Sequence, residues 1–202
     1  MPDPAFQGSL FGGVAPSIDP AFSSLTRRAL DERAWVDHAP GWLAGSDALF
    51  GTLVELADWG QYTRKMYGED VVQPRLNAGF LDDARLQAAA PVLEQMRVVL
   101  GERYGVEFTS GGLNYYRDGR DSVAWHRDKI PAAVVDPIVA IVSVGEPRKL
   151  LLRPRGGGRS IPYHLTGGDL LVTGGTTQRT WEHTVPKVAA AGPRISITFR
   201  HR

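Results

Sequence analysis

The second half of the chain consists of short apolar runs separated by turn residues, and this spacing limits the possible folds more than any other feature. From Gly111 onward, runs rich in β-branched and aromatic residues recur roughly every ten residues, with Gly, Pro and Asp between them. Such spacing is typical of an antiparallel sandwich or barrel. The runs span residues 122–128, 137–145, 148–154, 160–165, 169–175, 180–186 and 194–200.

Two amphipathic segments in the first half predict helices. Residues 46–59 carry leucines at helical spacing behind Ser46, which is a candidate N-cap. Residues 91–104 begin with Pro91 and are followed by Gly105, the usual order at the two ends of a helix. Helices followed by a series of strands predict an α+β fold in which the helices pack on one sheet.

The absence of cysteine restricts the chemistry of the chain. With 202 residues and no Cys, disulfides, thiolate nucleophiles, iron–sulfur clusters and cysteine-ligated zinc are all excluded. Any metal site must therefore use histidine and carboxylate ligands. The candidate histidines are His38, His126, His164, His183 and His201.

Charge and hydropathy give weaker indications. The formal net charge is +1, but acidic residues are in excess in the first half and basic residues, mostly Arg, in the second, which permits an anionic partner there. The N-terminal segment lacks the basic and apolar regions of a signal peptide, and no apolar run is long enough to span a bilayer. We expect a cytoplasmic protein with no membrane association, and a monomer, since no long heptad pattern is present.

A histidine and an aspartate lie two residues apart at the end of a predicted strand. Side chains alternate along a strand, so His126 and Asp128 are expected on one face. His183 lies in another predicted strand. Two histidines and one carboxylate on adjacent strands match the facial triad of non-heme Fe(II) oxygenases. A hydrolytic zinc centre uses similar ligands, but no general base is evident beside this set.

The last predicted strand alternates strictly between polar and apolar residues. Ile195, Ile197 and Phe199 share one face, and Arg194 and Arg200 belong to the other. Inward-facing arginines are costly unless they pair with anions. This face therefore either binds a small dicarboxylate or faces solvent at the edge of a sheet.

These motifs, taken in order, resemble the AlkB family of Fe(II)- and 2-oxoglutarate-dependent nucleic-acid dealkylases. The resemblance extends from about Asp31 to the C-terminus, and it is strongest to a bacterial AlkB-like subgroup with YRDGRDSVAWH, RGGG and QRTWEHTVPK stretches. The motifs that carry it are residues 114–119 (NYYRDG), His126–Asp128, Gly168–Leu170, His183 and Arg194–Arg200.

The resemblance implies a fold and residue roles. The fold would be a double-stranded β-helix, the jelly-roll form of the predicted sandwich. The implied Fe(II) ligands are His126, Asp128 and His183, and the implied 2-oxoglutarate-binding residues are Asn114, Tyr116, Arg194, Ser196 and Arg200.

The resemblance also implies a division of the chain. Residues 1–24, rich in Pro, Gly and Ser, would form a loosely ordered arm, and residues 25–202 a single Fe(II)/2-oxoglutarate dioxygenase domain. Within that domain, residues 25–110 would form a helical and lid part and residues 111–202 the jelly-roll catalytic core.

The implied activity is the O2-dependent removal of alkyl groups from damaged bases of DNA or RNA, as in DNA alkylation repair. The base would be single-stranded or flipped out of a duplex. The substrate-binding residues expected from the family's lid, from a basic cluster around the loop 154–159 and from the His183 face are Met66, Tyr67, Phe80, Arg75, Arg155 and Trp181.

Two departures from the family pattern leave the substrate open. Gly79-Phe80 stands in place of the usual aromatic-Gly turn, and Ile130 stands where many nucleic-acid dealkylases carry an acidic residue. Tyr67 and Phe80 also fit a role as ordinary core aromatics. The alternatives to dealkylation are a 2-oxoglutarate-dependent hydroxylase of a small molecule or protein side chain, and a non-catalytic jelly-roll binding module.

Overall fold

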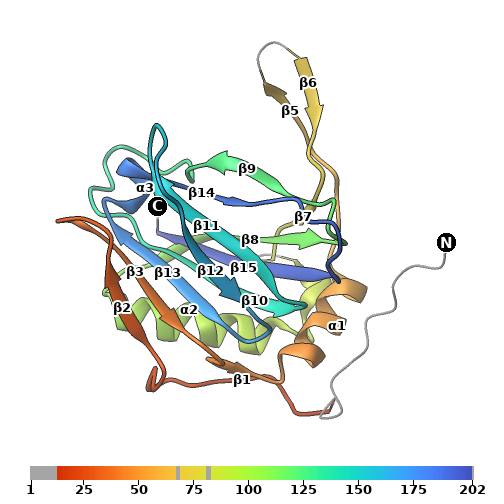
Figure 1. Ribbon diagram of the computed structural model, residues 1–202. Coiled ribbons are helices and arrows are strands. Elements are labelled where there is room, and N and C mark those ends of the chain that lie inside the picture. The colour runs from red at the N-terminus through yellow and green to blue at the C-terminus, as the bar shows by residue number, and fades with distance from the viewer. Residues whose placement is uncertain (1–12, 67–68, 81–82, 202) are drawn as a thin grey trace.

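The strands form two antiparallel sheets that face each other, with the helices on the outer side of the larger one (Figure 1). The computed structural model describes residues 13–66, 69–80 and 83–201, and for residues 64–66 and 69–71 it describes the backbone alone. The large sheet contains, in spatial order, β2 (Thr26–Ala29), β3 (Ala34–Ala39), β13 (Leu170–Gly175), β10 (Val139–Gly145), β15 (Arg194–His201), β8 (Phe108–Tyr116) and β7 (Leu76–Ala78).

The small sheet faces the large one across the interior of the protein. It contains β12 (Ile161–Leu165), β11 (Arg148–Pro154), β14 (Trp181–Val185) and β9 (Val123–His126). Two strand pairs lie outside both sheets: β1 (Ser17–Ile18) with β4 (Leu43–Ala44), and β5 (Thr63–Met66) with β6 (Glu69–Val72). The β5–β6 hairpin projects away from the body of the protein (Figure 1).

This arrangement confirms the predicted jelly-roll core with helices packed on one sheet. Each of the predicted runs contains a strand, and they follow the chain in order as β9 to β15. Residues 148–154 coincide with β11, and no boundary of the other runs differs by more than two residues.

The central strand β10 shows why these sequences form buried strands. Ala140, Val142 and Val144 join the core beneath the helices, whereas Val139 and Ile141 join the core between the sheets. A strand covered on both faces carries apolar residues without alternation. This explains why residues 137–145 form a continuous apolar run.

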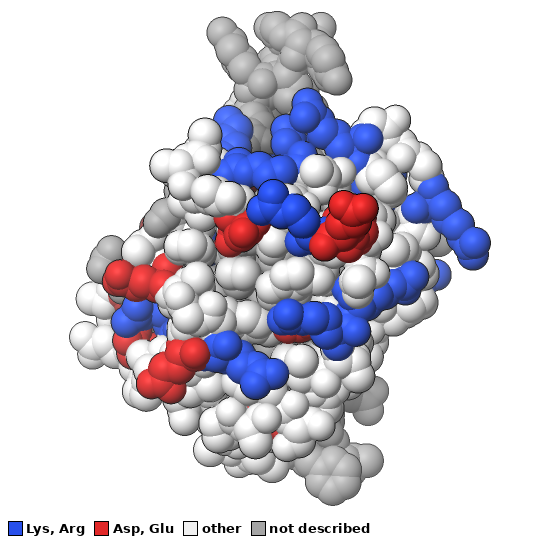
Figure 2. Space-filling model, turned by 90° about the vertical axis from the view of Figure 1, so that its left-hand side faces the viewer, with Lys and Arg blue, Asp and Glu red and all other residues white. Residues whose placement is uncertain are grey.

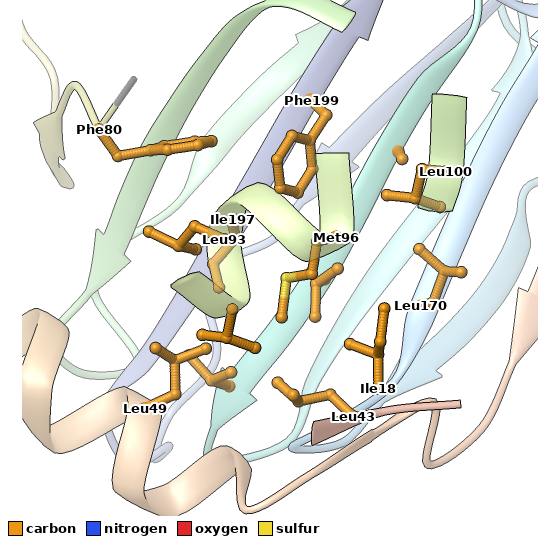
Figure 3. Packing of buried hydrophobic residues seen from close by; sticks show 14 of the residues in the cluster. Ile18, Leu43, Leu49, Phe80, Leu93, Met96, Leu100, Leu170, Ile197 and Phe199 are labelled. Atoms are coloured by element: carbon orange, nitrogen blue, oxygen red, sulfur yellow. The ribbon is translucent and has the colours of Figure 1, made fainter. Parts of the chain in front are cut away.

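The helices α1 (Ser46–Leu56) and α2 (Ala90–Tyr104) cover the outer face of the large sheet. Figure 3 shows Leu93 and Met96 of α2 directed toward the sheet, near Ile197 of β15. Gly105 ends α2 with a φ of 65°, as predicted. The predicted N-cap at Ser46 is wrong: Gly45 holds that position at a φ of 66° and no side chain caps α1.

The first part of the chain contributes more strand than was expected. The segment 25–110, expected to be helical and lid-forming, supplies β2, β3 and β7 to the large sheet, together with the start of β8. In β3 the polar residue Asp37 interrupts the apolar pattern, yet it is buried because Arg27 and Tyr104 bind its carboxylate. Periodicity alone does not reveal a strand whose polar side chains are satisfied by distant partners.

The described part of the expected N-terminal arm packs against the rest of the protein. Within its described residues, 13–24, Ile18 and Phe22 are buried in the helix-side core, and Ile18 pairs with Leu43. Two further helical turns, η1 (Ala84–Leu86) and α3 (Thr177–Thr180), connect the main elements. Among the described residues no helix is long and apolar enough to cross a membrane.

We predict that Asp169→Ala destabilises the fold by about 1–3 kcal/mol, since it leaves buried donors unpaired. The Asp169 carboxylate, which is buried, accepts hydrogen bonds from the backbone N–H groups of Gly41 and Thr166. Urea denaturation gives the free energy of unfolding. The control Glu55→Ala, on the exposed side of α1, should change it by at most about 0.5 kcal/mol, and equal values for the two variants would contradict the prediction.

Candidate metal centre and anion pocket

The structure brings together the predicted metal ligands from two neighbouring strands. His126 ends β9 and lies opposite His183 of β14 in the strand register, and Asp128 follows two residues beyond β9. The imidazole rings are 4.3 Å apart between centroids. One ligand atom from each of the three residues lies within 4.8 Å of the others. The predicted orientation of His126 and Asp128 toward one face is confirmed, since both line the same pocket.

A backbone contact orients the His126 imidazole. Its Nδ1 lies 2.9 Å from the Ala124 carbonyl oxygen, which accepts the hydrogen bond. Because a carbonyl cannot donate, a proton resides on Nδ1, so in the neutral imidazole Nε2 is the nitrogen with the free lone pair. Histidines that bind metals commonly use their second nitrogen in this way.

The other two ligands are held in the protonation states that metal binding needs. Burial opposes ionisation of Asp128, but Arg200 and the two histidines lower the pKa of the carboxyl group below its usual value. Burial, with His126 as the next cause, lowers the pKa of His183 to about 3. At neutral pH the cluster therefore presents a carboxylate and a neutral His183 imidazole.

The strand β15 carries the predicted arginines into the interior between the sheets. Arg194, Ser196, Thr198 and Arg200 line the same pocket as the metal ligands, whereas Ile195, Ile197 and Phe199 face the helices. The predicted alternation is therefore confirmed. We call this space, between β15 and β8 on one side and β9 and β14 on the other, the inner pocket.

Arg194 is a buried cation without an anionic partner among the described residues. It is 1% exposed, its Nε donates to Ser143 Oγ at 2.9 Å, and its Nη2 has no hydrogen-bond partner. Burial lowers the pKa of Arg194 to about 10, which still leaves the guanidinium charged at neutral pH. A buried charge with an unpaired N–H favours binding of an anion from solution.

The residues around Arg194 increase the positive charge of the inner pocket. Its lining contains the guanidiniums of Arg75, Arg194 and Arg200 and the single carboxylate of Asp128. Asn114 Oδ1 accepts a hydrogen bond from Arg75 Nε at 3.1 Å. The Tyr116 ring lies 5.3 Å from the guanidinium carbon of Arg194. Each predicted cosubstrate residue thus lines this pocket.

The donor set and the charge of the pocket fit an Fe(II) ion and 2-oxoglutarate. Two imidazoles and one carboxylate on one side leave positions free, which is the ligand arrangement of non-heme Fe(II) oxygenases. The excess of guanidinium groups suits a dicarboxylate. His126, Asp128 and His183 would hold the metal, and Arg194 with Arg200, Ser196, Asn114 and Tyr116 would hold the cosubstrate.

Comparison with known proteins identifies the family. The family model for the 2OG-Fe(II) oxygenase superfamily matches residues 77–200, which include each of these residues. The chain belongs to the 2OG-Fe(II) oxygenase superfamily. Members use Fe(II), 2-oxoglutarate and O2, and when bound this group supplies the oxidation of an unactivated carbon–hydrogen bond.

Several relatives are similar over much of the chain. An alpha-ketoglutarate-dependent dioxygenase alkB homolog 3 from Bos taurus is 32% identical over 80% of this chain and 64% of the relative. The homolog 3 from Homo sapiens is 36% identical over 54% of this chain and 42% of the relative. A DNA oxidative demethylase ALKBH2 from Arabidopsis thaliana is 30% identical over 70% of this chain and 57% of the relative. The chain thus spans less than two thirds of each of these relatives.

A solved structure supports the fold of the oxygenase. A crystal structure of an oxidoreductase of the 2OG-Fe(II) oxygenase family from Burkholderia pseudomallei superposes with a TM-score of 0.50. The two chains are 14% identical, and the match covers 76% of this chain and 77% of the other. At this identity the likeness concerns the fold alone.

A second, larger cavity of the oxygenase adjoins two of the three candidate metal ligands. We call it the outer cavity. His126 and Asp128 line both spaces, whereas His183 lines the inner pocket alone. The outer cavity has a volume of ≈ 750 Å³. It is lined by Trp125, His126, Arg127, Asp128, Lys129, Ile130, Pro131, Arg155, Gln178, Arg179 and Glu182.

Some residues predicted to bind substrate lie elsewhere. Phe80 is 7% exposed and packs against Phe199, at 5.3 Å between ring centroids, on the helix side of the large sheet. Trp181 shares the inward face with His183 as expected, but it is buried in the core between the sheets, and its Nε1 donates to Asp31 Oδ2 at 2.7 Å. Neither residue lines the outer cavity or the inner pocket.

The other predicted substrate residues have different outcomes. Arg155 lines the outer cavity, and Arg75 lines the inner pocket rather than an exposed surface. Met66 belongs to β5, but its side chain is not described, and Tyr67 lies outside the described residues.

Several residues of the outer cavity were missed from the sequence, among them Trp125, Lys129 and Gln178. Trp125 lines this cavity, and the guanidinium carbon of Arg153 lies 3.9 Å from its ring centroid. Lys129 directly follows the His126–Asp128 motif, and this position alone could have indicated that it lies beside the candidate metal site. Gln178 lies in α3, a turn too short for periodicity to reveal.

The departure at Ile130 has a structural explanation. Ile130 is 7% exposed and belongs to the core between the sheets. Its carbonyl oxygen accepts a hydrogen bond from Arg179 at 3.0 Å. An acidic side chain at this position would have to be buried among apolar residues, so an isoleucine suits this particular loop.

We predict that Arg194→Met abolishes the stabilisation of the protein by 2-oxoglutarate while preserving the fold. The methionine removes a buried, unpaired charge, which makes the unliganded protein at least as stable as the wild type. Thermal denaturation with Mn(II), with and without 2-oxoglutarate, measures the effect. A similar rise in Tm with 2-oxoglutarate in wild type and variant would contradict the assignment of Arg194 as a carboxylate ligand.

We predict that the metal-free protein loses stability as the pH falls from roughly 6.5, the usual pKa of histidine in an unfolded chain, toward about 3, the pKa of folded His183. In this range the unfolded chain binds a proton that folded His183 does not, so stability rises with pH. Urea denaturation at several pH values in the presence of a chelator measures the slope. His183→Leu should reduce this slope by the contribution of up to one bound proton. The exposed control His164→Gln should leave the slope unchanged.

Proposed function

We propose that the protein is an Fe(II)- and 2-oxoglutarate-dependent dioxygenase that oxidatively removes alkyl groups from damaged nucleic-acid bases. The observation that carries the proposal is that the candidate metal ligands line the inner pocket, and that two of them, His126 and Asp128, also line the outer cavity, whose chemistry differs. The inner pocket suits a dicarboxylate, and the outer cavity combines an aromatic side chain with basic ones. Relatives named alkB homolog 3 and DNA oxidative demethylase ALKBH2 support the same activity.

The basic side chains of the outer cavity differ in their availability. The guanidinium of Arg179 donates to the carbonyl oxygens of Ile130, Pro131 and Val134, so it is already satisfied. Lys129 and Arg155 are exposed, and among the described residues no hydrogen bond or ion pair engages their side chains. These two side chains are the proposed contacts to the phosphates of a nucleic-acid strand.

Trp125 is the proposed stacking surface for a base beside the target. Its ring is held by Arg153, and Arg153 Nε donates to Glu182 Oε1 at 2.6 Å. A held aromatic ring next to cationic groups is the usual combination in single-strand binding. Figure 2 shows Lys and Arg side chains spread over the face on which α3 lies, with scattered acidic groups between them.

A base inside a duplex does not reach a metal between two sheets, so the proposed substrate is single-stranded or has a flipped base. We also propose that residues 25–202 work as one catalytic domain. A monomeric state and a cytoplasmic location stay predictions.

The test of the function is a turnover assay with single-stranded DNA and RNA oligonucleotides that carry N-methylated bases. With Fe(II), 2-oxoglutarate and O2, we expect succinate formation coupled to loss of the methyl mass from the oligonucleotide. His126→Ala should abolish both. Succinate formation that no methylated nucleic acid stimulates would contradict the proposal and favour a hydroxylase of a small molecule or protein side chain.

We predict that Lys129→Ala and Arg155→Ala each weaken oligonucleotide binding and each reduce the slope of log affinity against log salt by about 1. The reason is that each removes one phosphate contact and the counterion that it releases. Fluorescence anisotropy at several salt concentrations measures the slope. Lys187→Ala, an exposed lysine past the other end of β14, is the matched control, and an equal change in that variant would contradict the assignment.

A further inference from the structure

The backbone of Asp128 lies outside the strand ladders that hold the two histidines. β9 ends at His126, and its pairing with β14 consists of His183 with His126 and Val185 with Val123, with a shift of register between them. Asp128 therefore belongs to a loop, although its carboxylate must meet a metal together with two strand residues. Another contact has to define the position of its main chain.

Gln178 makes that contact. Its Oε1 accepts a hydrogen bond from the Asp128 backbone N–H at 2.9 Å, and its Nε2 donates to Thr173 Oγ1 at 3.0 Å. Thr173 Oγ1 in turn lies 3.4 Å from the Val139 carbonyl oxygen, which accepts its proton. The orientation of the amide follows from chemistry, since a backbone N–H only donates. Gln178 is 2% exposed, so water does not replace these bonds easily.

This series of hydrogen bonds connects the metal loop to the large sheet. Thr173 belongs to β13 and Val139 to β10, both inside the seven-stranded sheet. The Asp128 carboxylate is connected to the same sheet through Arg200 Nε of β15, at 2.7 Å. The main chain and the side chain of Asp128 are thus tied to the large sheet independently.

The neighbouring residue Arg179 holds the rest of the loop. Its guanidinium donates to the carbonyl oxygens of Ile130, Pro131 and Val134 at 2.7–3.0 Å. Its own carbonyl oxygen accepts from Arg127 Nη1 at 3.2 Å. Because α3 leads directly into β14, the segment that holds the Asp128 loop also presents His183.

We propose that Gln178 is a positioning residue of the metal centre, which sets the place of Asp128 relative to the two histidines. The proposal rests on the Fe(II) site of the proposed function and is independent of the substrate. Groups that orient metal ligands commonly change metal affinity 10–100-fold when they are removed. A backbone shift of Asp128 would weaken metal binding even though every ligand remains.

The experiment measures Mn(II) binding to the full chain by electron paramagnetic resonance, which detects the free ion. Gln178→Met keeps the length of the side chain but removes both hydrogen bonds, and we expect binding about 10–100-fold weaker than in the wild type.

The matched control is Thr177→Val, also in α3. Thr177 Oγ1 is bonded to the backbone of Trp35 and Gly174 rather than to the metal loop. It should lower the melting temperature and leave Mn(II) affinity within about twofold. Wild-type affinity in Gln178→Met, or an equal loss in the control, would overturn the proposal.

A second variant applies if Gln178→Met does not fold. Thr173→Val keeps the Gln178 side chain but removes the acceptor of its amide, together with the longer bond from Thr173 to the Val139 carbonyl oxygen. Gln178 then loses its orientation, and we expect Mn(II) affinity to fall about threefold or more. Wild-type affinity in this variant would overturn the proposal. The anaerobic charge-transfer band of the Fe(II)–2-oxoglutarate complex should also weaken in both variants at limiting Fe(II). Neither readout uses nucleic acid, so a failure of the proposed substrate class would leave these results unchanged.

Discussion

The ion pair between Arg200 and Asp128 is the contact on which the site depends. Arg200 comes from the large sheet, and Asp128 follows β9 of the small sheet, so the 2.7 Å hydrogen bond joins the two layers beside the metal ligands. It keeps the carboxylate ionised despite burial. It also satisfies Oδ2, while Oδ1 lies 3.9 Å from His126 Nε2. The pair thus connects the two sheets at this point. It also holds the Asp128 carboxylate in the ionised state that metal binding needs.

The charge of the interior explains why the site needs ligands from solution. Arg194 is fully buried with an unpaired nitrogen, and Arg75 adds a further guanidinium to the lining. In a protein without a bound anion such a group only costs stability. Its presence in a pocket lined by further guanidinium groups is consistent with a dicarboxylate cosubstrate, and the adjoining outer cavity is left for the substrate.

Much of the fold and of the metal site was predictable because it follows from local alternation. The strict pattern of β15 indicated which of its residues face the helices and which face the pocket. The two-residue spacing of His126 and Asp128 indicated a shared face. The substrate side was less predictable: Phe80 and Trp181 are aromatic residues near the motifs, and only packing shows that Phe199 and Asp31 engage them. Strand β3 was missed because distant residues satisfy its buried Asp37.

The sequence by itself predicted the candidate metal ligands, the inward-facing arginines and the succession of strands from β9 to β15, because each depends on the short-range pattern within a strand. The tertiary structure alone decided which side chains are free to act. Lys129 and Arg155 remain available, whereas Arg179 is occupied by three carbonyl oxygens, and the sequence treats the three alike. Likewise, only the folded chain brings Gln178 to the main chain of Asp128, fifty residues earlier. Such contacts depend on the packing of segments that are distant in sequence, and short-range patterns carry no information about them.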